Sequence, residues 1–209
     1  MATADAPLVA IFADESCLGN GREGDNPGGA GVLVEYARAG GEIVRRDIWV
    51  AERATTNNRM ALRSVIEAFR AIAHKGTYFR VVFTTDSRYI VDGMSQWVHD
   101  WARRDWKRKS GAIENLALWR EAVAAVNGHE VEWRWVRGHD GHAQNEYANH
   151  LAISAATNQS NSAALVDSGY DAWASRLSGV ASKLRLEPFP DGRSFKAAKR
   201  LPGVEAGRP

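Results

Sequence analysis

The sequence predicts an α/β domain in which three β-strands come first and helices alternate with strands after them. Short β-prone runs bounded by Gly- and Asn-rich turns indicate the strands, and amphipathic segments indicate the helices. Together they give the order βββαβααβα along the chain. With 209 residues, of which 44% are apolar, the chain is long enough for one large domain, or for one domain with an appendage.

The first three strands are expected to form an antiparallel set. The first run, LVAIFA at 8–13, ends abruptly at Asp14 and Glu15 and is followed by a Gly- and Asn-rich loop. The next runs lie at 31–36 and at about 43–50, and the Gly-Gly pair between them suits a tight turn.

Helices and buried strands are expected after this set. Asn57 or Asn58 is placed to cap a helix at about 59–74, whose apolar residues approximate one stripe. The remaining expected elements are a strand at 79–85, helices at about 87–101 and 112–127, a strand at 131–136 and a helix at about 143–157.

The composition changes after the last of these helices to Asn, Ser, Gly and Pro, with aromatic residues scattered singly. Such a segment is too sparse to bury a core of its own. We therefore expect a domain at 5–157 and a C-terminal extension at 158–209 that lies partly on the domain and partly in solvent.

Composition excludes several classes of protein. The formal charge of +2 is close to balanced, so only local clusters of charge are informative. A single cysteine, Cys17, excludes an internal disulfide framework and a cysteine-rich zinc site, which fits a reducing compartment. No apolar run approaches the roughly 20 residues that span a bilayer, and the first residues lack an export signal. We expect a cytoplasmic protein that does not act at a membrane.

Two carboxylates stand at expected strand ends, Asp14 after IFA and Asp86 after VVFTT. An aspartate at a strand end is usually a cap or a turn former. At the tips of neighbouring strands, however, two of them can converge on a hard divalent cation such as Mg²⁺. His139 follows in a Gly-flanked loop, a position that suits a mobile proton shuttle, although an isolated loop histidine is more often only solvated.

These residues belong to a series of motifs that resembles the type 1 ribonuclease H family. The matching segments are DESCLGN (14–20), TTNNRMAL (55–62), TTDSRYIVDGMSQWVHDWARRDW (84–106), ENLALW (114–119), EWRWVRGHDGH (132–142) and NEYANHLA (145–152). The resemblance implies a ribonuclease H-like fold, a five-stranded mixed sheet with three antiparallel strands, then two parallel additions, and flanking helices. It also implies hydrolysis of the RNA strand of RNA·DNA hybrids with two Mg²⁺ ions, for which Mn²⁺ can substitute.

The resemblance implies that three active-site residues of the family have counterparts in this chain. They are the carboxylates Asp14 and Asp86 and the loop histidine His139. Two positions depart from the family pattern. The helix-borne glutamate of the family is Ala61 here, and the aspartate of the last helix is Asn149. Asn149 is the milder change because an amide oxygen can still ligate a hard cation, whereas a methyl group cannot.

The missing carboxylate has two candidate replacements. Glu15 is adjacent to the first aspartate, but strand alternation points residues 14 and 15 to opposite faces, so Glu15 is expected to need a bulge or twist to reach the metals. Glu146 lies three residues before Asn149, on the same helical face. An impaired site and an engineered Glu-to-Ala change are the remaining interpretations. The favoured metal-ligating set is Asp14, Glu15, Asp86 and Asn149.

Substrate binding has its own candidates. In a basic aromatic stretch at 97–109, positively charged residues are interleaved with tryptophans that can support them. This pattern suits phosphate contacts, although it could also be a solvated basic face. Asn57 and Asn58 can contact base edges and sugars in the minor groove, and Thr56 can contact a phosphate of the DNA strand. The remaining expected substrate-binding residues, several of them at positions near the backbones in the family, are Cys17, Asn20, Arg88, Trp97, Arg103, Arg104, Trp106 and Lys107.

The sequence therefore favours an endoribonuclease that acts on RNA·DNA hybrids as a monomer, without an obligatory protein partner. The first alternative is a hybrid-binding protein that has lost cleavage, which Ala61 favours and Glu15 opposes. The second is a fold used only for protein contact, against which the basic aromatic stretch argues.

Overall fold

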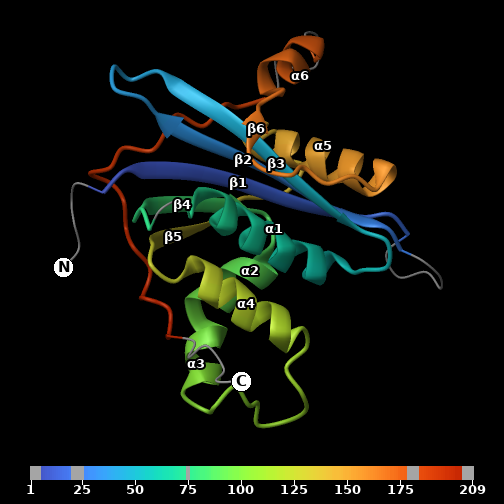
Figure 1. Cartoon of the computed structure of the whole chain (residues 1–209), viewed down its shortest axis with the longest axis vertical. Helices are drawn as coiled ribbons and strands as arrows, with labels where there is room; N and C mark the ends of the chain where they lie inside the picture. The colour runs from blue at the N-terminus through green and yellow to red at the C-terminus, as the bar shows by residue number, and fades with distance from the viewer. Residues whose placement is uncertain (1–5, 20–25, 74–75, 178–183, 204–209) are drawn as a thin grey trace.

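The computed structural model describes residues 6–19, 26–73, 76–177 and 184–203. A six-stranded mixed sheet, in the order β5-β4-β1-β2-β3-β6, forms its centre (Figure 1). β1, β2 and β3 pair antiparallel, and β4 and β5 extend the sheet in parallel on the other side of β1. The strands are β1 (Leu8–Cys17), β2 (Gly28–Ala37), β3 (Ile43–Glu52), β4 (Arg80–Thr85), β5 (Glu130–Trp135) and β6 (Val166–Asp167). The expected α/β class and mixed sheet are confirmed, with the short β6 as an additional sixth strand.

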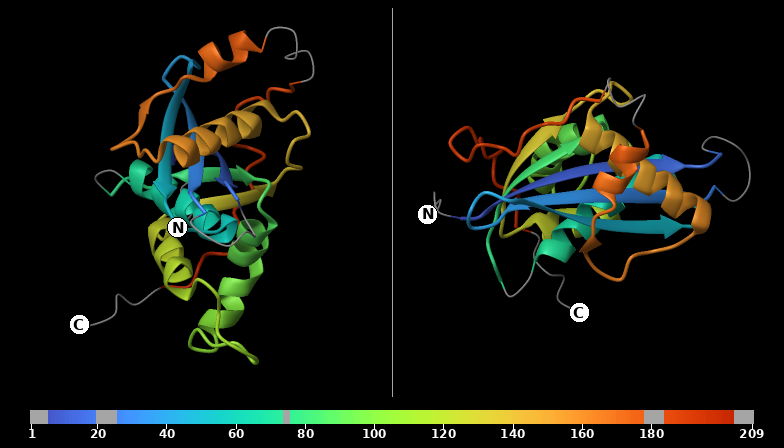
Figure 2. Two further views of the ribbon diagram at one scale, coloured as in Figure 1. Left: turned by 90° about the vertical axis from the view of Figure 1, so that its right-hand side faces the viewer. Right: turned by 90° about the horizontal axis from the view of Figure 1, so that it is seen from above.

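Helices cover both faces of this sheet (Figures 1 and 2). One face carries α1 and α4, and the opposite face carries α5. The helical elements are α1 (Asn57–Ile72), α2 (Arg88–Asp92), the π-helical segment η1 (Gly93–Trp97), α3 (Val98–Ala102), α4 (Leu116–Val126), α5 (Ala143–Asn158) and α6 (Tyr170–Arg176). No helix in the described part of the chain is long and apolar enough to cross a membrane.

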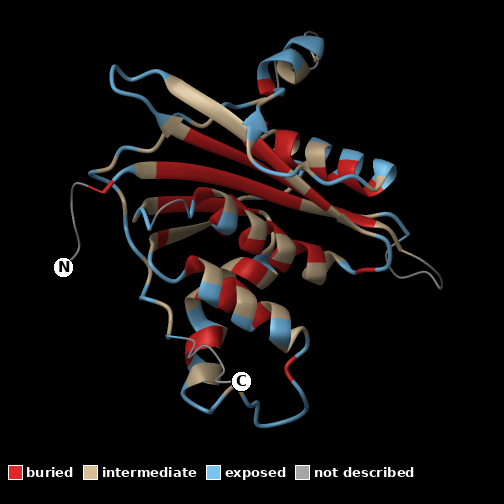
Figure 3. Cartoon of the chain, in the orientation of Figure 1, coloured by how far each residue is buried: buried red, intermediate tan, exposed pale blue. Residues whose placement is uncertain are grey.

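Strand alternation explains why the core has two parts. Ile11 and Ala13 of β1 point into the larger cluster, with α1, whereas Ala10 and Phe12 point into the smaller cluster, with Tyr147 of α5. The central strands are accordingly buried along most of their length (Figure 3).

The first strand is longer than the sequence predicts. β1 pairs with β2 as far as Cys17 opposite Gly28, so Asp14 and Glu15 lie within the strand rather than in a loop. The sequence GGAG, which starts β2, was assigned to the turn because it is rich in glycine. A Cβ at Gly29 or Gly31 would lie 2.2 Å from a carbonyl oxygen of α5, so these glycines are needed for the close approach of that helix to the sheet.

Three helices also differ from the prediction, two in where they begin and one in its interior. Thr56, not Asn57 or Asn58, is the N-cap of α1, and its Oγ1 accepts from the Arg59 backbone N–H at 3.4 Å. The helix expected at 112–127 begins only at Leu116, since Asn115 adopts a left-handed φ of 56° that a right-handed helix cannot include. The helix expected at 87–101 contains the π-helical segment η1, so its apolar spacing departs from a regular α-helix.

The C-terminal extension contributes to the same structure. β6 pairs with β3, and Tyr170 and Trp173 of α6 pack against Tyr147 of α5. Farther along the chain, the Ala198 backbone N–H donates to Val131 O of β5 at 2.7 Å. The division of the chain at residue 157 stays a prediction.

Candidate active site

Three carboxylates meet at the end of the two central parallel strands. Asp14 and Glu15 lie in β1, and Asp86 directly follows β4. One ligand atom from each lies within 4.8 Å of the others. The parallel pairing of β1 with β4 ends at Ala13 opposite Thr85, which brings these residues to the same edge of the sheet.

Glu15 reaches this cluster from the face of the sheet that α1 covers. Its cross-strand partner in β2 is Ala30, and Ala30 packs with Met60 of α1. Residues directly opposite in an antiparallel pair point to the same face, so Glu15 points toward α1 while Asp14 points toward α5. The expected bulge is absent, because the β1–β2 pairing continues unbroken from Val9 to Cys17. With β4 already ended, no strand of the described chain pairs with residues 14 and 15 on that side, so both carboxylates can turn toward Asp86.

Ala61 and Asn149, the two positions that depart from the family pattern, lie in different surroundings. Ala61 is fully buried in the core cluster beneath α1. Asn149 is half-buried on α5, one turn after Asn145 and therefore on the same helical face. Glu146 is not a member of the three-carboxylate cluster, although its charge contributes to the electrostatics described below.

The electrostatics of the cluster disfavour the ionised form of all three carboxylates when no cation is bound. Burial raises the pKa of Asp14 to about 8, and the charges of Asp86 and Glu146 act in the same direction. Burial also raises the pKa of Glu15 well above its ordinary value, with a further contribution from Asp14, while a hydrogen bond from the Ser87 side chain opposes the rise. The pKa of Asp86 is raised mainly by burial, and the nearby His139 lowers it. A bound cation would compensate this concentration of negative charge.

The donor set fits a hard divalent cation. All three carboxylates offer oxygen, the ligand that Mg²⁺ and Mn²⁺ prefer. Glu15 Oε2 and Asn145 Oδ1 are buried and have no hydrogen-bond partner in the described part of the chain. Buried acceptors without partners are costly unless they ligate something, so the residues present suit a metal.

Asn145 and Gly138 are parts of the site that sequence reasoning missed. Asn145 Nδ2 donates to Asp14 Oδ2 at 3.0 Å, which joins α5 to β1 at the first carboxylate. A Cβ at Gly138 would lie 2.1 Å from Asp86 Oδ2, so any larger residue here requires the His139 loop or that carboxylate to shift. The i,i+4 spacing of Asn145 and Asn149 was the signal that could have identified the first.

The expected loop histidine lies at the edge of the cluster. His139 has a positive φ of 55°, and its side chain is 78% exposed. Its Nδ1 lies 3.8 Å from Glu146 Oε2. An exposed imidazole beside carboxylates can accept and release protons to solvent.

The expected substrate-binding residues fall into two groups. Cys17 and Thr56 to Asn58 lie together where β1 ends and α1 begins, since the Cys17 Sγ donates to the Thr55 carbonyl at 3.4 Å. Arg88 is exposed beside the cluster, and its guanidinium carbon lies 3.8 Å from the ring centre of Trp135. The Trp135 indole donates to the Asp86 carbonyl at 2.9 Å. Asn20 lies outside the described residues.

The basic aromatic stretch separates into packed rings and exposed charges. Trp97 and Trp106 are half-buried and pack against the main core cluster. Arg103, Arg104 and Lys107 are exposed. The aromatic rings therefore support the surface, on which Arg103 forms an ion pair with Asp100 and Lys107 Nζ lies 3.3 Å from Asp105 Oδ2. Exposed ion pairs of this kind are weak, so phosphates can compete for these basic side chains.

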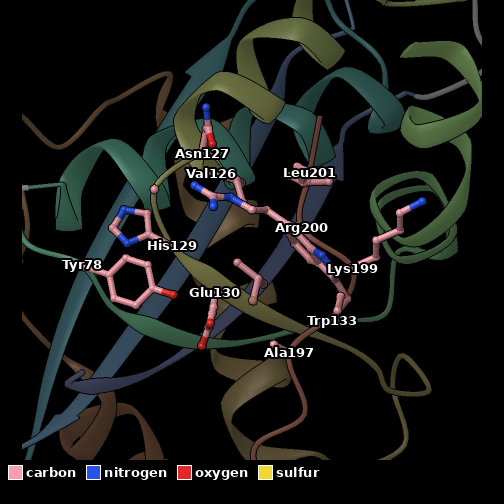
Figure 4. Close-up of a pocket in the computed structure, with 13 residues that line it drawn as sticks. Tyr78, Val126, Asn127, His129, Glu130, Trp133, Ala197, Lys199, Arg200 and Leu201 are labelled. Atoms are coloured by element: carbon pink, nitrogen blue, oxygen red, sulfur yellow. The ribbon is translucent and has the colours of Figure 1, made fainter. Parts of the chain in front are cut away.

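A separate cavity of about 340 Å³ lies between the start of β5 and the C-terminal segment, with Tyr78, His129 and Arg200 among its walls (Figure 4). Because β4 and β5 run parallel, the start of β5 is the opposite end from the carboxylates. This cavity is not part of the candidate active site.

Known proteins resemble both the domain and the whole chain. Ribonuclease H from Vibrio vulnificus is 39% identical over 163 residues, which cover 78% of this chain and 95% of that protein. Ribonuclease H from Photorhabdus luminescens is 37% identical over 163 residues, covering 78% and 94%. The crystal structure of LC9-RNase H1, a type 1 RNase H with the type 2 active-site motif, is 77% identical, covers 98% of each chain and superimposes with a TM-score of 0.91. The RNase H family profile matches residues 6–157. The carboxylate cluster at the end of β1 and β4, the surrounding fold and these likenesses lead to one conclusion: the chain belongs to the RNase H family.

Proposed function

We propose that this ribonuclease H cleaves the RNA strand of RNA·DNA hybrids with two Mg²⁺ ions held by Asp14, Glu15, Asp86 and Asn149. In this proposal Glu15 supplies the carboxylate that the family carries at the position of Ala61. The observation that carries it is the cluster of three carboxylates within 4.8 Å, in which Glu15 Oε2 is buried and unpartnered within the described chain.

Two further observations support a replacement carboxylate, and the first of them favours Glu15 over Glu146. Glu15 lies on the α1 side of the sheet, the side on which Ala61 is buried, so a carboxylate is available from the same direction. In addition, the solved protein that is 77% identical combines a type 1 fold with a type 2 active-site motif. A type 2 active-site motif on a type 1 fold in so similar a protein argues against a simple loss of function at Ala61.

The roles of the side chains follow from their positions. When bound, a cation pair of this kind activates a water molecule and stabilises the charge on the leaving oxygen. Asp14, Glu15 and Asp86 would hold the pair, and Asn149 would add an amide oxygen from α5. His139, exposed in its loop, would carry protons between the site and solvent and aid product release.

Hybrid binding is assigned to two surfaces. Arg103, Arg104 and Lys107, supported by Trp97 and Trp106, would contact phosphates of the DNA strand. The remaining contacts would come from Cys17, Asn20, Thr56, Asn57, Asn58 and Arg88, which would follow the wide minor groove of the hybrid. Action as a monomer in the cytoplasm is part of the same proposal.

A labelled RNA·DNA hybrid incubated with Mg²⁺ or Mn²⁺ tests this function. We expect the parent to cleave the RNA strand and Glu15→Gln to lose several kcal/mol of transition-state stabilisation, on the order of 1000-fold in rate. Glu42→Gln, an exposed glutamate that pairs with Arg38 in the distant hairpin, is the matched control and should cleave at the parental rate.

Other outcomes would reject the proposal in part or whole. A parent that retains the hybrid on a gel without cleaving it would identify a hybrid-binding protein instead. A parent that cleaves and loses activity with Glu146→Gln but not with Glu15→Gln would assign the carboxylate to α5.

A further inference from the structure

The C-terminal segment is bound to the loop that leads from His139 into α5. The Arg185 backbone N–H donates to the Gly141 carbonyl at 2.7 Å, and the Ala143 N–H donates to the Arg185 carbonyl at 3.0 Å. The Arg185 guanidinium donates to the carbonyl and carboxylate oxygens of Asp140 at 2.6 and 3.1 Å. A segment more than 40 residues away in sequence thus fixes the course of this loop.

Glu187 lies at the centre of these contacts. Its backbone is held by Gln144, whose side chain donates to the Glu187 carbonyl at 2.7 Å and accepts from its N–H at 3.0 Å. Its carboxylate accepts from Arg134 Nη1 of β5 at 3.1 Å and lies 2.7 Å from His142 Nε2. Gln144 is fully buried, so the reciprocal pair is shielded from water.

The contact with Glu187 determines the proton position on the His142 ring. His142 is the N-cap of α5, and its Nδ1 accepts from the Asn145 backbone N–H at 3.3 Å. An imidazole nitrogen that accepts carries no proton, so the proton is on Nε2, where it is donated to Glu187. The ring also packs against Phe12 of β1, with 5.6 Å between ring centres. A carboxylate partner thereby selects both the tautomer and the orientation that cap the helix.

The capped residue, Asn145, is the one that touches the catalytic cluster. Its Nδ2 donates to Asp14 Oδ2 at 3.0 Å, and its Oδ1 is buried without a partner in the described chain. A series of contacts therefore runs from Glu187 through His142 and Asn145 to Asp14.

We propose that Glu187 of the C-terminal segment is a positioning residue for the active site, which fixes Asp14 through the His142 cap and the Asn145 side chain. The proposal rests on the function proposed above for the Asp14 cluster. It assigns the extension a part in activity that residues 6–157 alone do not supply.

Variants of the full chain test the proposal with two measurements. The first is the affinity of the protein for Mn²⁺ alone, measured by titration calorimetry without substrate. The second is the steady-state cleavage of a hybrid, with kcat and KM determined separately. The variants are Glu187→Ala, which removes the acceptor, and Glu187→Gln, which keeps a neutral acceptor for His142. Asp191→Ala is the control, because Asp191 is an exposed carboxylate of the same segment that accepts from the Arg193 N–H in its own turn.

We expect Glu187→Ala to weaken Mn²⁺ binding and to lower kcat, each by about 10-fold, with KM for the hybrid nearly unchanged. Glu187→Gln should recover most of both losses, and Asp191→Ala should match the parent. All measurements are made well below the thermal midpoint of each variant, so that loss of folded protein does not change the measured affinities and rates.

Two results would overturn the proposal. The first is a Glu187→Ala protein with parental Mn²⁺ affinity and parental kcat. The second is an equal loss in Glu187→Ala and Glu187→Gln, because the proposed role requires only an acceptor. A parent that binds Mn²⁺ but cleaves no hybrid would reject the proposed function alone, and the calorimetric comparison would still decide the role of Glu187.

Discussion

Asn145 of α5 donates a side-chain hydrogen bond to Asp14 of β1 across 3.0 Å, so the last helix of the domain meets the first strand at a buried carboxylate. This contact holds one oxygen of Asp14 in place. The other oxygen, Oδ1, accepts from the Glu15 backbone N–H at 2.7 Å.

Removing the Asn145 amide should therefore impair catalysis more than folding. We expect Asn145→Ala to lower kcat by about 10- to 100-fold, as for the loss of a group that orients a metal ligand. Asn158→Ala is the matched control, because Asn158 lies at the exposed end of the same helix and its side chain donates to Ser154 Oγ at 3.2 Å. Steady-state kinetics on a labelled hybrid make the comparison, and equal rates for the two variants would remove Asn145 from the site.

A methyl group at position 138 should displace Asp86. The added Cβ would lie 2.1 Å from the Asp86 carboxylate, and either the loop or the carboxylate must move. We expect Gly138→Ala to lower kcat by about 100-fold, since a displacement of about 1 Å can cost that much. Gly203→Ala introduces the same methyl group at a position where no atom of the described chain lies within 4 Å, and it should leave kcat unchanged. A Gly138→Ala protein as active as the parent would show that the loop is free to adjust.

It should be possible to move the metal-ligating carboxylate from position 15 in β1 to position 61 in α1. Glu15 and Ala61 share one face of the sheet, so Glu15→Ala combined with Ala61→Glu returns the charge to the α1 side. We expect the double variant to cleave more than about 10-fold faster than Glu15→Ala alone, because a carboxylate ligand is regained. Ala61→Glu in the parent should instead lower the thermal midpoint, since a second charge enters a fully buried position. A double variant no faster than Glu15→Ala would mean that position 61 does not lead to the metals.

Metal-free protein should lose stability as the pH rises. The pKa of Asp14 is raised from 3.8 to about 8 in the folded protein, chiefly by burial. Between these two values the folded state binds more protons than the unfolded state, so its free energy of unfolding decreases as pH increases.

Asp14→Asn removes this titration while keeping an oxygen acceptor. We expect it to raise the free energy of unfolding by roughly 4 kcal/mol at pH 7 and to have little effect below pH 4. Urea unfolding in the presence of a chelator at both pH values makes the measurement. Asp191→Asn is the control, because Asp191 is exposed and the neighbouring Gly192 accepts from Arg80 at the start of β4, the opposite end of that strand from the carboxylates. A stability gain that is the same at both pH values would contradict the electrostatic explanation.

The exposed arginines should control binding rather than chemistry. Arg103→Ala is expected to raise KM without changing kcat and to reduce the slope of log affinity against log salt by about 0.7 to 0.9, the value for one phosphate contact. Arg38→Ala removes an arginine from the distant hairpin and should leave both quantities unchanged. An unchanged salt slope in Arg103→Ala would exclude a phosphate contact at this position.

How much of the site could be predicted depends on how local each interaction is. Asp14, Asp86 and His139 were identified because strand ends and glycine-flanked loops leave a local signature in the sequence. Asn145, Gly138 and Glu187 were missed because their importance comes from partners 45 to 131 residues away, such as Asp14 for Asn145. The i,i+4 spacing of Asn145 and Asn149 is a local signal, but a single sequence does not show which distant residue each of these side chains contacts.

The sequence by itself determined the α/β class, the order of the elements and the oxygen-rich chemistry at the ends of β1 and β4, because periodicity and residue type act over a few neighbouring positions. The tertiary structure decided that β1 continues past Asp14, that Glu15 reaches the cluster without a bulge, and that the C-terminal segment supports α5. Those features depend on where strands stop beside one another and on how closely helices approach glycines. They are fixed only when distant parts of the chain pack together.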